Sequence, residues 1–450
     1  MKKHSLSTWL YFLVPSILGI LLFMIPFKFG EEWKVPIAKF AAILSGWLEP
    51  AMPMAAMFII VIAALGSIAF LFIPRNSSNP SLAESLFKVT PFWTITRLLG
   101  AVFAVMVTFK IGPEAIWSED TGGLLLAPDG LVSFLFTIFL FAGLLLPLLL
   151  NFGLLEFFGT MMVKVMRPLF NLPGRSSIDA LASWIGDGTI GVLLTSKQYE
   201  DGHYTQREAA IIATTFSVVS ITFSLVIIDT VGMSQYFLPF YATVILTGIV
   251  LALIVPRIYP LRGKKEEYID GRKFTGAEEK LPEGYNVVSH GLEYALDKAS
   301  KNRSISTTIK DGMKNVLDMW IGVAPVVMAF GTVALILAET TSVFTILGKP
   351  FEPILALLNI PEAAEAAQMM VVGFADMFLP VILADGVITS PITLFTIATI
   401  SVVQLIYMSE VGGLILGTKI PLNILDLIII FLLRTLIALP IVAGVAHLLF

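Results

Sequence analysis

The sequence predicts an all-α polytopic membrane protein, built as an inverted repeat around two re-entrant helical hairpins. Three observations lead to this fold class. Hydrophobic residues make up 56% of the 450-residue chain and charged residues 14%, whereas soluble domains carry about 25% charged residues. Several apolar runs are long enough to cross a bilayer. Two further segments, 172–196 and 360–385, are interrupted by acids in the middle and are too polar for ordinary spanning helices.

Nine spanning helices are expected in chain order. They are placed at residues 10–27, 54–74, 92–109, 131–153, 209–231, 237–256, 316–338, 392–414 and 424–449. Four units follow from this order: an N-terminal three-span bundle (1–130), a first repeat (131–256), a cytoplasmic linker (257–315) and a second repeat (316–450). Each repeat consists of a span, an amphipathic surface helix, a hairpin and two spans. The surface helices are expected at 154–170 and 341–358, and the linker is expected to hold a short helix near 287–300.

The first hairpin reads LPGRSSIDALASWIGDGTIGVLLTS and carries Asp179 and Asp187. Gly186 and Gly188 divide it into halves of roughly ten residues, or about 15 Å of helix each. Such a half reaches the middle of a bilayer but cannot cross it. Backbone groups freed at the break need protein or water around them, so the tip is expected inside the protein.

A second copy of this pattern supports the repeat. With one inserted residue, segment 360–385 brings Asp376 onto Asp187, and the spans after both hairpins share Thr, Ser, Val and Val at matching positions. Lys and Arg gather in residues 1–4, 75–88, 164–175 and 257–315, whereas loop 111–130 is acidic. The positive-inside rule then places the N-terminus in the cytoplasm and the C-terminus outside, so the hairpins enter from opposite sides.

The acids at the two hairpin breaks allow two interpretations, which can hold together. Asp187 and Asp376 can cap the half-helices that follow them, or they can hold a cation or a proton, since a carboxylate at mid-membrane is costly alone. The spans after the hairpins each present a polar face at helical spacing. Its members are Ser217, Ser220 and Ser224, and Ser401, Gln404 and Tyr407. These side chains either bond their own helices or line a binding site.

Three charged residues lie in the spans, and two of them are left with open alternatives. Glu410, just before two glycines, marks an unwound segment or pairs with Lys419. Arg434 has an ion-pair partner inside the protein or extends to the membrane surface. Arg97, near a span end, is expected to extend to the surface.

The hairpins and the spans after them resemble the nucleoside-recognition (Gate) domain group. This group includes the concentrative nucleoside transporters, the membrane domain of ferrous-iron transport protein B, and spore maturation proteins A and B. The residues that carry the resemblance are RPLFNLPGRSSIDALASWIGDG, KQYEDGHYTQREAAIIAT, QLIYMSEVGG and KIPL. It covers residues 131–450, and the whole chain looks most like the YjiH family of bacterial inner-membrane proteins.

The resemblance implies a core like that of the concentrative nucleoside transporters, and it implies two groups of site residues by position. The ion-coupling candidates are Ser183, Asp187, Thr189, Ser217 and Ser220. The substrate-binding candidates are Gln368, Asp376, Gln404, Tyr407 and Glu410.

We therefore expect a secondary active transporter of a small polar solute (nucleoside-like, an amino acid or a small peptide), bound at mid-membrane between the hairpins. Sodium and protons are both open as the coupling ion. One alternative is a Gate-type protein that acts in an assembly without transport of its own. A minor alternative is an intramembrane aspartyl protease that uses Asp187 and Asp376, although Trp184 stands where the GxGD motif needs its first glycine.

The composition bounds the remaining possibilities. The chain has no cysteine, its four histidines have no zinc-ligand spacing, and no GxxxxGK[ST] motif is present, so no thiolate metal site or self-contained ATP hydrolysis is expected. We expect no enzymatic activity, no cofactor beyond Na⁺ or H⁺, and no nucleic acid as partner, since the net charge is −4. The expected partners are the solute and membrane lipid, the expected location is the bacterial inner membrane, and a homo-oligomer is left open.

Overall fold

Helices form almost all of the regular structure in the computed structural model of the protein. It describes residues 5–23, 25, 27–29, 32–73, 81–128, 130–183, 188–216, 219, 221–276, 286–302 and 304–450. The N-terminal elements are α1 (Leu6–Phe23), β1 (Phe27–Phe29), β2 (Glu32–Lys34), α2 (Pro36–Trp47), α3 (Met52–Leu71), α4 (Leu82–Phe87), α5 (Pro91–Phe109), α6 (Glu114–Trp117) and α7 (Gly122–Leu126). β1 and β2 pair antiparallel as one small ribbon.

The first repeat and the linker follow. Their elements are α8 (Leu131–Leu145), α9 (Pro147–Leu150), α10 (Leu154–Phe170), α11 (Ser176–Leu181), α12 (Gly188–Glu200), α13 (Gln206–Thr215), α14 (Ile221–Thr230), η2 (Ser234–Tyr236), α15 (Phe237–Ile254), η3 (Val255–Arg257), η4 (Leu261–Gly263) and α16 (Val287–Lys301). The predicted surface helix 154–170 is confirmed as α10, and the short linker helix as α16. Asn171, in the left-handed conformation that tolerates Asn, ends α10.

The second repeat contains the same kinds of element. They are α17 (Ile305–Gly322), α18 (Ala324–Thr340), α19 (Val343–Gly348), η6 (Lys349–Phe351), α20 (Glu352–Leu357), α21 (Ala363–Val372), α22 (Leu379–Ala384), α23 (Pro391–Val403), α24 (Val411–Gly417) and α25 (Ile424–Leu449). The predicted interruption of hairpin 2 is confirmed, because α21 and α22 are separated at residues 373–378. The arms of hairpin 1 are α11 and α12, and its predicted break at Gly186 and Asp187 lies outside the described residues.

The expectation of nine continuous spans is wrong at two places. In the described residues, seven helices are long and apolar enough to cross a membrane. The expected spans 209–231 and 392–414 are each broken, into α13 and α14 and into α23 and α24. Hydropathy records apolar residues and not whether the backbone between them is continuous, so the break in 209–231 was not predicted. The break in 392–414 confirms the alternative that Glu410 marks an unwound segment, and Lys419 pairs with Glu200.

The expected span 316–338 is too short. α17 already begins at Ile305, inside the predicted linker, and the run Ile305–Thr340 forms one candidate span. Ser304 explains the start, because its hydroxyl accepts the Thr307 N–H at 3.3 Å as an N-cap. The first turns of α17 are polar, with Lys310 and Asp311, so a hydropathy window does not include them.

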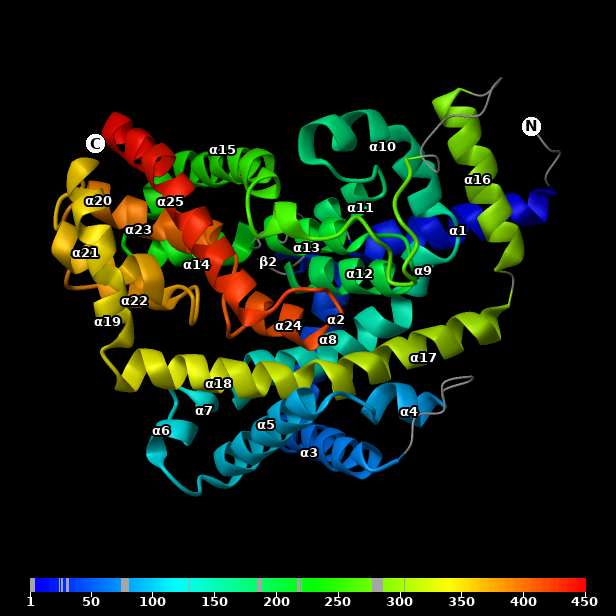
Figure 1. Ribbon diagram of the computed structural model, residues 1–450, viewed down its shortest axis with the longest axis horizontal. Helices are drawn as coiled ribbons and strands as arrows, with labels where there is room; N and C mark the ends of the chain where they lie inside the picture. The colour runs from blue at the N-terminus through cyan, green and yellow to red at the C-terminus, as the bar shows by residue number, and fades with distance from the viewer. Residues whose placement is uncertain are drawn as a thin grey trace.

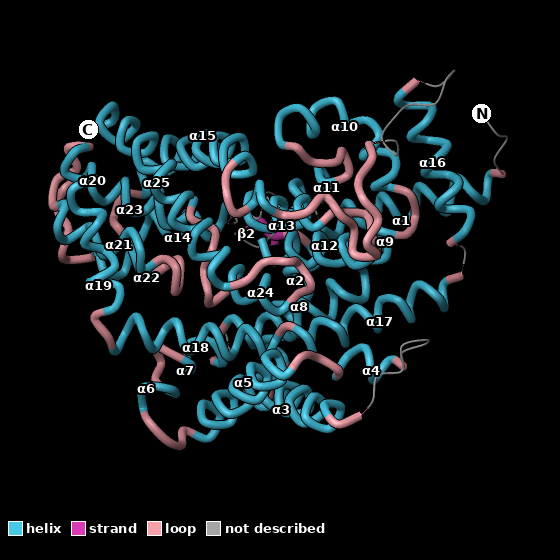
Figure 2. The backbone as a smooth tube through the Cα atoms, in the orientation of Figure 1, coloured by secondary structure: helices cyan, strands magenta, loops and turns pink. Residues whose placement is uncertain are grey.

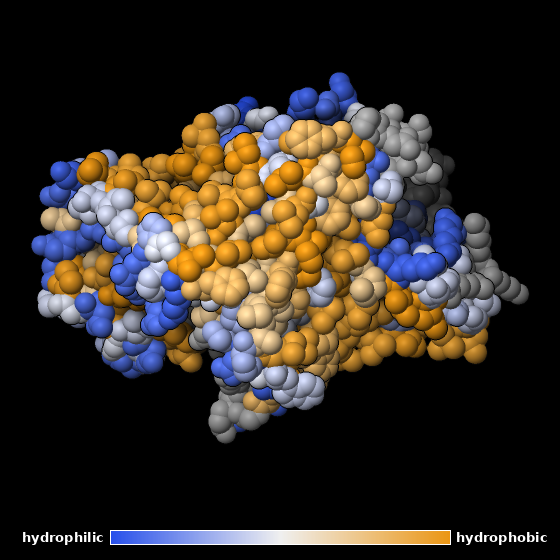
Figure 3. Space-filling model, turned by 90° about the horizontal axis from the view of Figure 1, so that it is seen from below, coloured by the Kyte–Doolittle hydropathy of each residue, from blue (hydrophilic) through white to orange (hydrophobic). Residues whose placement is uncertain are grey.

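The helices α17 and α18 form the frame of the molecule. Figure 1 shows them as one long rod, with α3 and α5 packed on one side and the repeat elements on the other. Figure 2 shows loop segments in the middle of the molecule as well as at its ends, as expected for broken helices in a core. Figure 3 shows a broad hydrophobic surface flanked by hydrophilic residues on the face seen from below. That surface fits a protein surrounded by lipid.

The two hairpins are rooted at opposite ends of the molecule. At the linker end, Lys264 of the linker pairs with Asp426 in the first turn of α25 at 2.6 Å, and the Gln206 N–H that opens α13 bonds Glu267. At the C-terminal end, His447 near the end of α25 lies 2.9 Å from the carbonyl of Leu358, just before hairpin 2. Because α25 joins these two ends, α12 returns to the linker end and hairpin 2 to the other.

The loops fall into two groups at opposite ends of the molecule, as the inverted topology predicts. In Figure 1 the N-terminus, α16 and α4 lie toward one end, and α6, α20 and the C-terminus toward the other. The packing is reciprocal as well: α24 contacts α12 of hairpin 1, and α14 contacts α22 of hairpin 2. Which end faces the cytoplasm stays a prediction.

Candidate functional site

The second break, residues 404–410 between α23 and α24, crosses the interior beside hairpin 2. Its backbone pairs with the interruption of the hairpin: Met408 N–H donates to the Phe374 carbonyl at 2.8 Å, and Ser409 N–H to the Ala375 carbonyl at 3.0 Å. Leu405 has φ +63°, a conformation that costs a branched side chain energy and persists only where the surroundings impose it. The break is therefore a defined structure rather than a frayed helix end.

Asp376 fastens the tip of hairpin 2 to this break. Its Oδ1 accepts the Phe378 N–H at 2.8 Å, and its Oδ2 accepts the Ser409 hydroxyl at 2.6 Å. The first bond is the local turn that Asp and Asn favour. This turn lies before α22, whose N-cap residue is Phe378 and which has no side-chain cap, so the prediction that Asp376 caps the half-helix is wrong in the strict sense. The side chain stays partly accessible.

Gln404 is the most constrained polar side chain of the second break. It is fully buried, and its amide nitrogen donates to the Met370 carbonyl at 2.7 Å and to the Thr435 hydroxyl at 2.9 Å. Its Oε1 has no hydrogen-bond partner among the described residues. A Cβ added at Gly373 would lie 2.3 Å from that oxygen, so the glycine is what lets the amide approach the hairpin. A buried acceptor left unpaired is costly, which makes this oxygen a candidate ligand for a solute or an ion.

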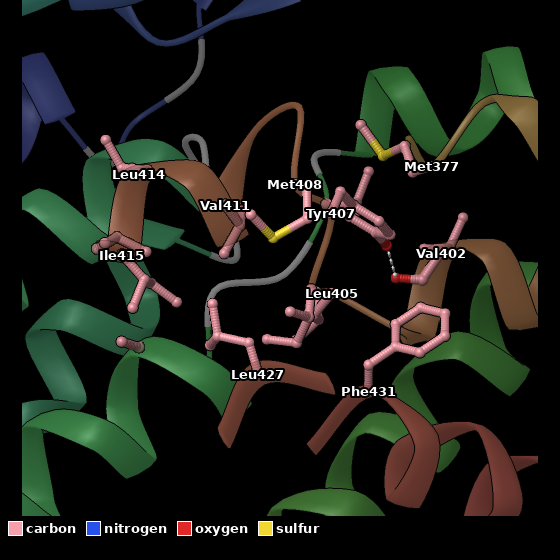
Figure 4. Close-up of a cluster of buried hydrophobic side chains, with 14 of the residues drawn as sticks. Met377, Val402, Leu405, Tyr407, Met408, Val411, Leu414, Ile415, Leu427 and Phe431 are labelled. Atoms are coloured by element: carbon pink, nitrogen blue, oxygen red, sulfur yellow. Dashed lines mark hydrogen bonds between the residues drawn. The ribbon is translucent and has the colours of Figure 1, made fainter. Parts of the chain in front are cut away.

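Tyr407 has a structural role at the end of α23. Its buried hydroxyl lies 2.6 Å from the Ser401 carbonyl and 2.8 Å from the Val402 carbonyl, and donates to them. Figure 4 shows the phenol directed at Val402, within an apolar cluster that includes Leu405, Met408 and Phe431. The hydroxyl thereby satisfies carbonyls that the broken helix leaves without an N–H.

Arg434 joins the two breaks. Its guanidinium, 1% exposed, donates through Nε and Nη2 to the Val403 carbonyl at 3.0 and 2.7 Å, and through Nη1 to the Thr214 carbonyl at 3.0 Å. Val403 ends α23 and Thr214 is the last residue but one of α13. The C-terminus of a helix carries a partial negative charge, so one cation stabilises both half-helices. Of the two predicted alternatives for Arg434, extension to the surface is wrong, and its hydrogen bonds go to carbonyls rather than to a carboxylate of the described residues.

The other predicted site residues are only partly brought together. Asp187, Ser217 and Ser220 lie outside the described residues. Ser183 and Thr189 are buried in hairpin 1, and the Ser183 hydroxyl has no partner among the described residues.

Two substrate-side candidates differ in their positions. Glu410, partly exposed, is the N-cap residue of α24 and so lies at the second break. Gln368 instead accepts a hydrogen bond from the Thr345 hydroxyl of α19 at 3.0 Å, on the side of hairpin 2 that carries the surface helices. Gln368 is therefore not brought to the break.

Asp179 is a buried acid to which the sequence analysis gave no role. Its carboxylate, 1% exposed, accepts hydrogen bonds from Thr195 at 3.2 Å, Gln198 at 3.2 Å and Tyr204 at 2.8 Å. These donors lie on α12 and the turn after it, so Asp179 clasps the two arms of hairpin 1 together. A Thr and a Gln three residues apart on α12 share a helix face, and that spacing was the only signal available in the sequence.

A polar cavity of about 220 Å³ lies between hairpin 1 and the frame, and we call it the linker-end cavity. One wall is a single face of α12, formed by Leu193, Ser196, Lys197 and Glu200. Residues of α4, α5, α17, the start of α18 and the end of α24 form the others. Lys419, on its rim, has a side chain that is 64% exposed, so the cavity opens to solvent at the linker end. Leu193 lies roughly 8 Å along α12 from Gly188, the first residue of that helix.

Arg97 lines this cavity, and its predicted extension to the membrane surface is wrong. The side chain is 5% exposed, and Nη1 donates to the Ser67 hydroxyl at 2.8 Å and to the Leu86 carbonyl at 3.0 Å. The serine of α3 and the short helix α4 hold the guanidinium at the cavity wall, because both offer oxygens on the inner side of α5.

Comparison with known proteins agrees with this architecture. A family model described as Gate, nucleoside recognition, matches residues 132–234. The chain is a Gate-domain membrane protein. The matched stretch of this Gate-domain protein runs from α8 through hairpin 1 and the first broken helix. Gate domains occur in membrane proteins related to nucleoside transporters, which supports a transporter-type role in general terms.

A full-length relative places the Gate-domain protein in a family. It is 51% identical over 452 residues to an uncharacterized protein of Alkalihalophilus pseudofirmus, with 100% of this chain and 97% of the relative covered. The chain therefore belongs to the same family as that protein. No solved structure matches it. The more specific resemblance to the YjiH family stays a prediction.

Proposed function

We propose that this protein is a secondary active transporter of a small polar solute, coupled to sodium or to protons. The solute binds between the two hairpins, near the middle of the membrane. The chain itself carries out no chemical conversion in this proposal.

The observation that carries the proposal is the meeting of two broken helices at one buried guanidinium. α13 starts from the linker end and α23 from the opposite end, and Arg434 caps the ends of both. Broken helices expose backbone polar groups, which is tolerated at membrane depth only where protein or a water-filled cavity surrounds them. In secondary transporters such breaks hold the solute and the coupling ion, and inverted halves provide alternating access.

Asp376, Gln404 and Glu410 are the residues we assign to the solute side. Gln404 offers an unpaired amide oxygen, and Asp376 and Glu410 are partly accessible acids at the break. Tyr407 contributes by holding the end of α23. We leave Gln368 out, because its amide oxygen is bonded to Thr345. On the ion side we retain Ser183 and Thr189.

The experiment that tests the proposal begins with a thermal-shift screen of purified protein against nucleosides, amino acids and dipeptides, with and without sodium. A ligand that binds the folded state raises its melting temperature by mass action. Uptake of each hit is then measured in proteoliposomes against imposed sodium and proton gradients. Uptake that follows a gradient and falls in Glu410→Gln supports transport. Hits that bind without any gradient-driven uptake contradict it.

We also propose that the linker end faces the cytoplasm of a bacterial inner membrane. The cysteine-free chain allows single cysteines in the turn 197–206 and in the loop 340–362. A membrane-impermeant thiol reagent added to intact cells should label only the second. Labelling of both from outside contradicts the inverted topology.

A further inference from the structure

Arg97 is a buried cation without a carboxylate partner among the described residues. Its guanidinium donates to two neutral oxygens, the Ser67 hydroxyl and the Leu86 carbonyl. No described carboxylate lies within salt-bridge distance of it. Burying a charge is costly unless an opposite charge compensates it. The position is therefore electrostatically incomplete, and it faces the linker-end cavity rather than lipid.

The remaining charges of the cavity largely cancel. Its lining holds four cationic side chains, Lys88, Arg97, Lys197 and Lys419, against the carboxylates of Glu200 and Asp318. Lys419 pairs with Glu200 at 2.8 Å, and Lys197 pairs with Asp201, just beyond the lining, at 3.3 Å. Counting Asp201, one positive charge is left over. Arg97 is the most deeply buried of the cations.

The wall around Arg97 also offers neutral polar groups suited to an anion. Ser85 stands on the rim, Ser196 faces the cavity from α12, and Asn315 faces it from α17. A guanidinium with donors still directed at a cavity matches the geometry of carboxylate and phosphate oxygens, which it can bind in bidentate fashion. The volume of about 220 Å³ admits a small molecule only.

We propose that the solute carried by this protein is a small anion with a carboxylate or phosphate group, which Arg97 binds in the linker-end cavity before the solute enters the site between the two hairpins. The inference rests on the proposed transport function and specifies its substrate class. The cavity contacts hairpin 1 on one side, and α5 and the frame helices α17 and α18 on the other.

A labelling experiment tests the charge of the cavity without knowledge of the solute. Ser85→Cys and Ser196→Cys are made singly in the cysteine-free chain and purified. Each is modified with the anionic ethylsulfonate and the cationic ethyltrimethylammonium methanethiosulfonate. Relative to exposed Ser342→Cys at the opposite end, the anionic reagent should be favoured about tenfold at both sites. Ser85 is exposed, so it decides the outcome if Ser196 does not react.

Variants of Arg97 locate the source of this preference. Arg97→Gln should abolish it and Arg97→Lys should retain most of it. Arg207→Gln, the same substitution outside the cavity at an arginine paired with Glu266, should leave it unchanged. If Arg97→Gln fails to fold, the ratio of anionic to cationic labelling in Ser85→Cys, with Arg97 intact, still tests the proposal. Equal modification by both reagents there overturns the proposal.

Binding is then tested with succinate and inorganic phosphate against uridine, at equal ionic strength. Either anion should raise the melting temperature and slow modification of Ser196→Cys, and Arg97→Gln should remove both effects. Protection by uridine alone, or by neither anion, overturns the anion assignment. Gradient-driven uptake of uridine in that case would uphold transport, so failure of the substrate class is distinguishable from failure of the function.

Discussion

The two hairpins hold their arms together in different ways. Hairpin 1 is self-contained: Asp179 on its first arm accepts hydrogen bonds from Thr195 and Gln198 on its second arm and from Tyr204 in the turn beyond. Hairpin 2 is fastened outward. At its interruption, Asp376 and backbone carbonyls accept hydrogen bonds from the second break. At its base, the Glu362 carboxylate accepts the Ser390 N–H just before α23.

This difference suggests how the halves divide their roles. Hairpin 2 and the second break share hydrogen bonds at membrane depth, so we expect them to move as one body. Hairpin 1 contacts α13 and α24 through α12, but another face of α12 borders the open linker-end cavity. We therefore expect the relative motion during transport to occur between hairpin 1 and the frame.

Removal of Arg434 should have the largest effect, because this side chain joins the two halves. Arg434→Leu leaves the carbonyls of Val403 and Thr214 buried without donors, at a cost of roughly 2–5 kcal/mol. Denaturant titration in detergent measures the loss of unfolding free energy. Arg434→Lys keeps the charge but loses the planar guanidinium, so its unfolding free energy should lie between those of the parent protein and Arg434→Leu. A leucine variant as stable as the parent protein would show that the guanidinium does not hold the breaks.

The clasp of hairpin 1 is tested by comparing its acid with that of hairpin 2. Asp179→Ala leaves the buried Tyr204 hydroxyl without its acceptor, whereas Thr195 and Gln198 keep a second one, and the change should cost about 1–3 kcal/mol. Asp376→Asn should change stability little, because an amide oxygen can still accept the Phe378 N–H. The same denaturant titration measures both. Equal losses in the two variants would remove the distinction between a self-contained and a fastened hairpin.

The sequence predicted the interruptions of the hairpins more fully than those of the spans. Gly186 and Gly188 predict the first hairpin break by local chemistry alone, although Gly186 lies outside the described residues, and α10 was placed at its residues by amphipathic spacing. The break at Gln404 depends on contacts with Met370 and Thr435, more than thirty residues away in both directions. No local pattern contains such partners.

The partners of the two buried arginines could not be predicted from the sequence either. Arg97 and Arg434 both lie in apolar helices, where sequence reasoning favours or allows extension to the surface. Their actual partners are a serine and backbone carbonyls of other helices, and any sequence position provides a carbonyl. The linker-end cavity likewise arises from six separate helices, so it could be found only from the fold.

Gly373 tests how closely hairpin 2 is fastened to the second break. In Gly373→Ala the new methyl group would lie 2.3 Å from Gln404 Oε1, and the amide cannot move freely because its nitrogen holds two hydrogen bonds. The expected cost is about 1–2 kcal/mol, read as a lower melting temperature. Gly444→Ala is the matched control, since a Cβ there has no heavy atom within 4 Å. A change at Gly444 as large as at Gly373 would argue against a close contact at the break.

The base of hairpin 2 should show the smallest effect, and one that depends on pH. The Glu362 carboxylate accepts hydrogen bonds from the Thr389 hydroxyl at 2.7 Å and from the Thr389 and Ser390 N–H groups at 3.1 Å. These bonds, led by the Thr389 hydroxyl, lower the pKa of Glu362 below its usual value near 4.5. A lowered pKa means that the stabilisation is complete above the ordinary pKa and is lost as the pH falls through the folded-state value. We therefore expect the Thr389 and Ser390 amides to lose protection against hydrogen exchange, relative to intrinsic rates, once the pH drops below 4.5. In Glu362→Gln the protection should be weaker at neutral pH and should not change over that range, and an unchanged acid response in this variant would assign the effect to another group.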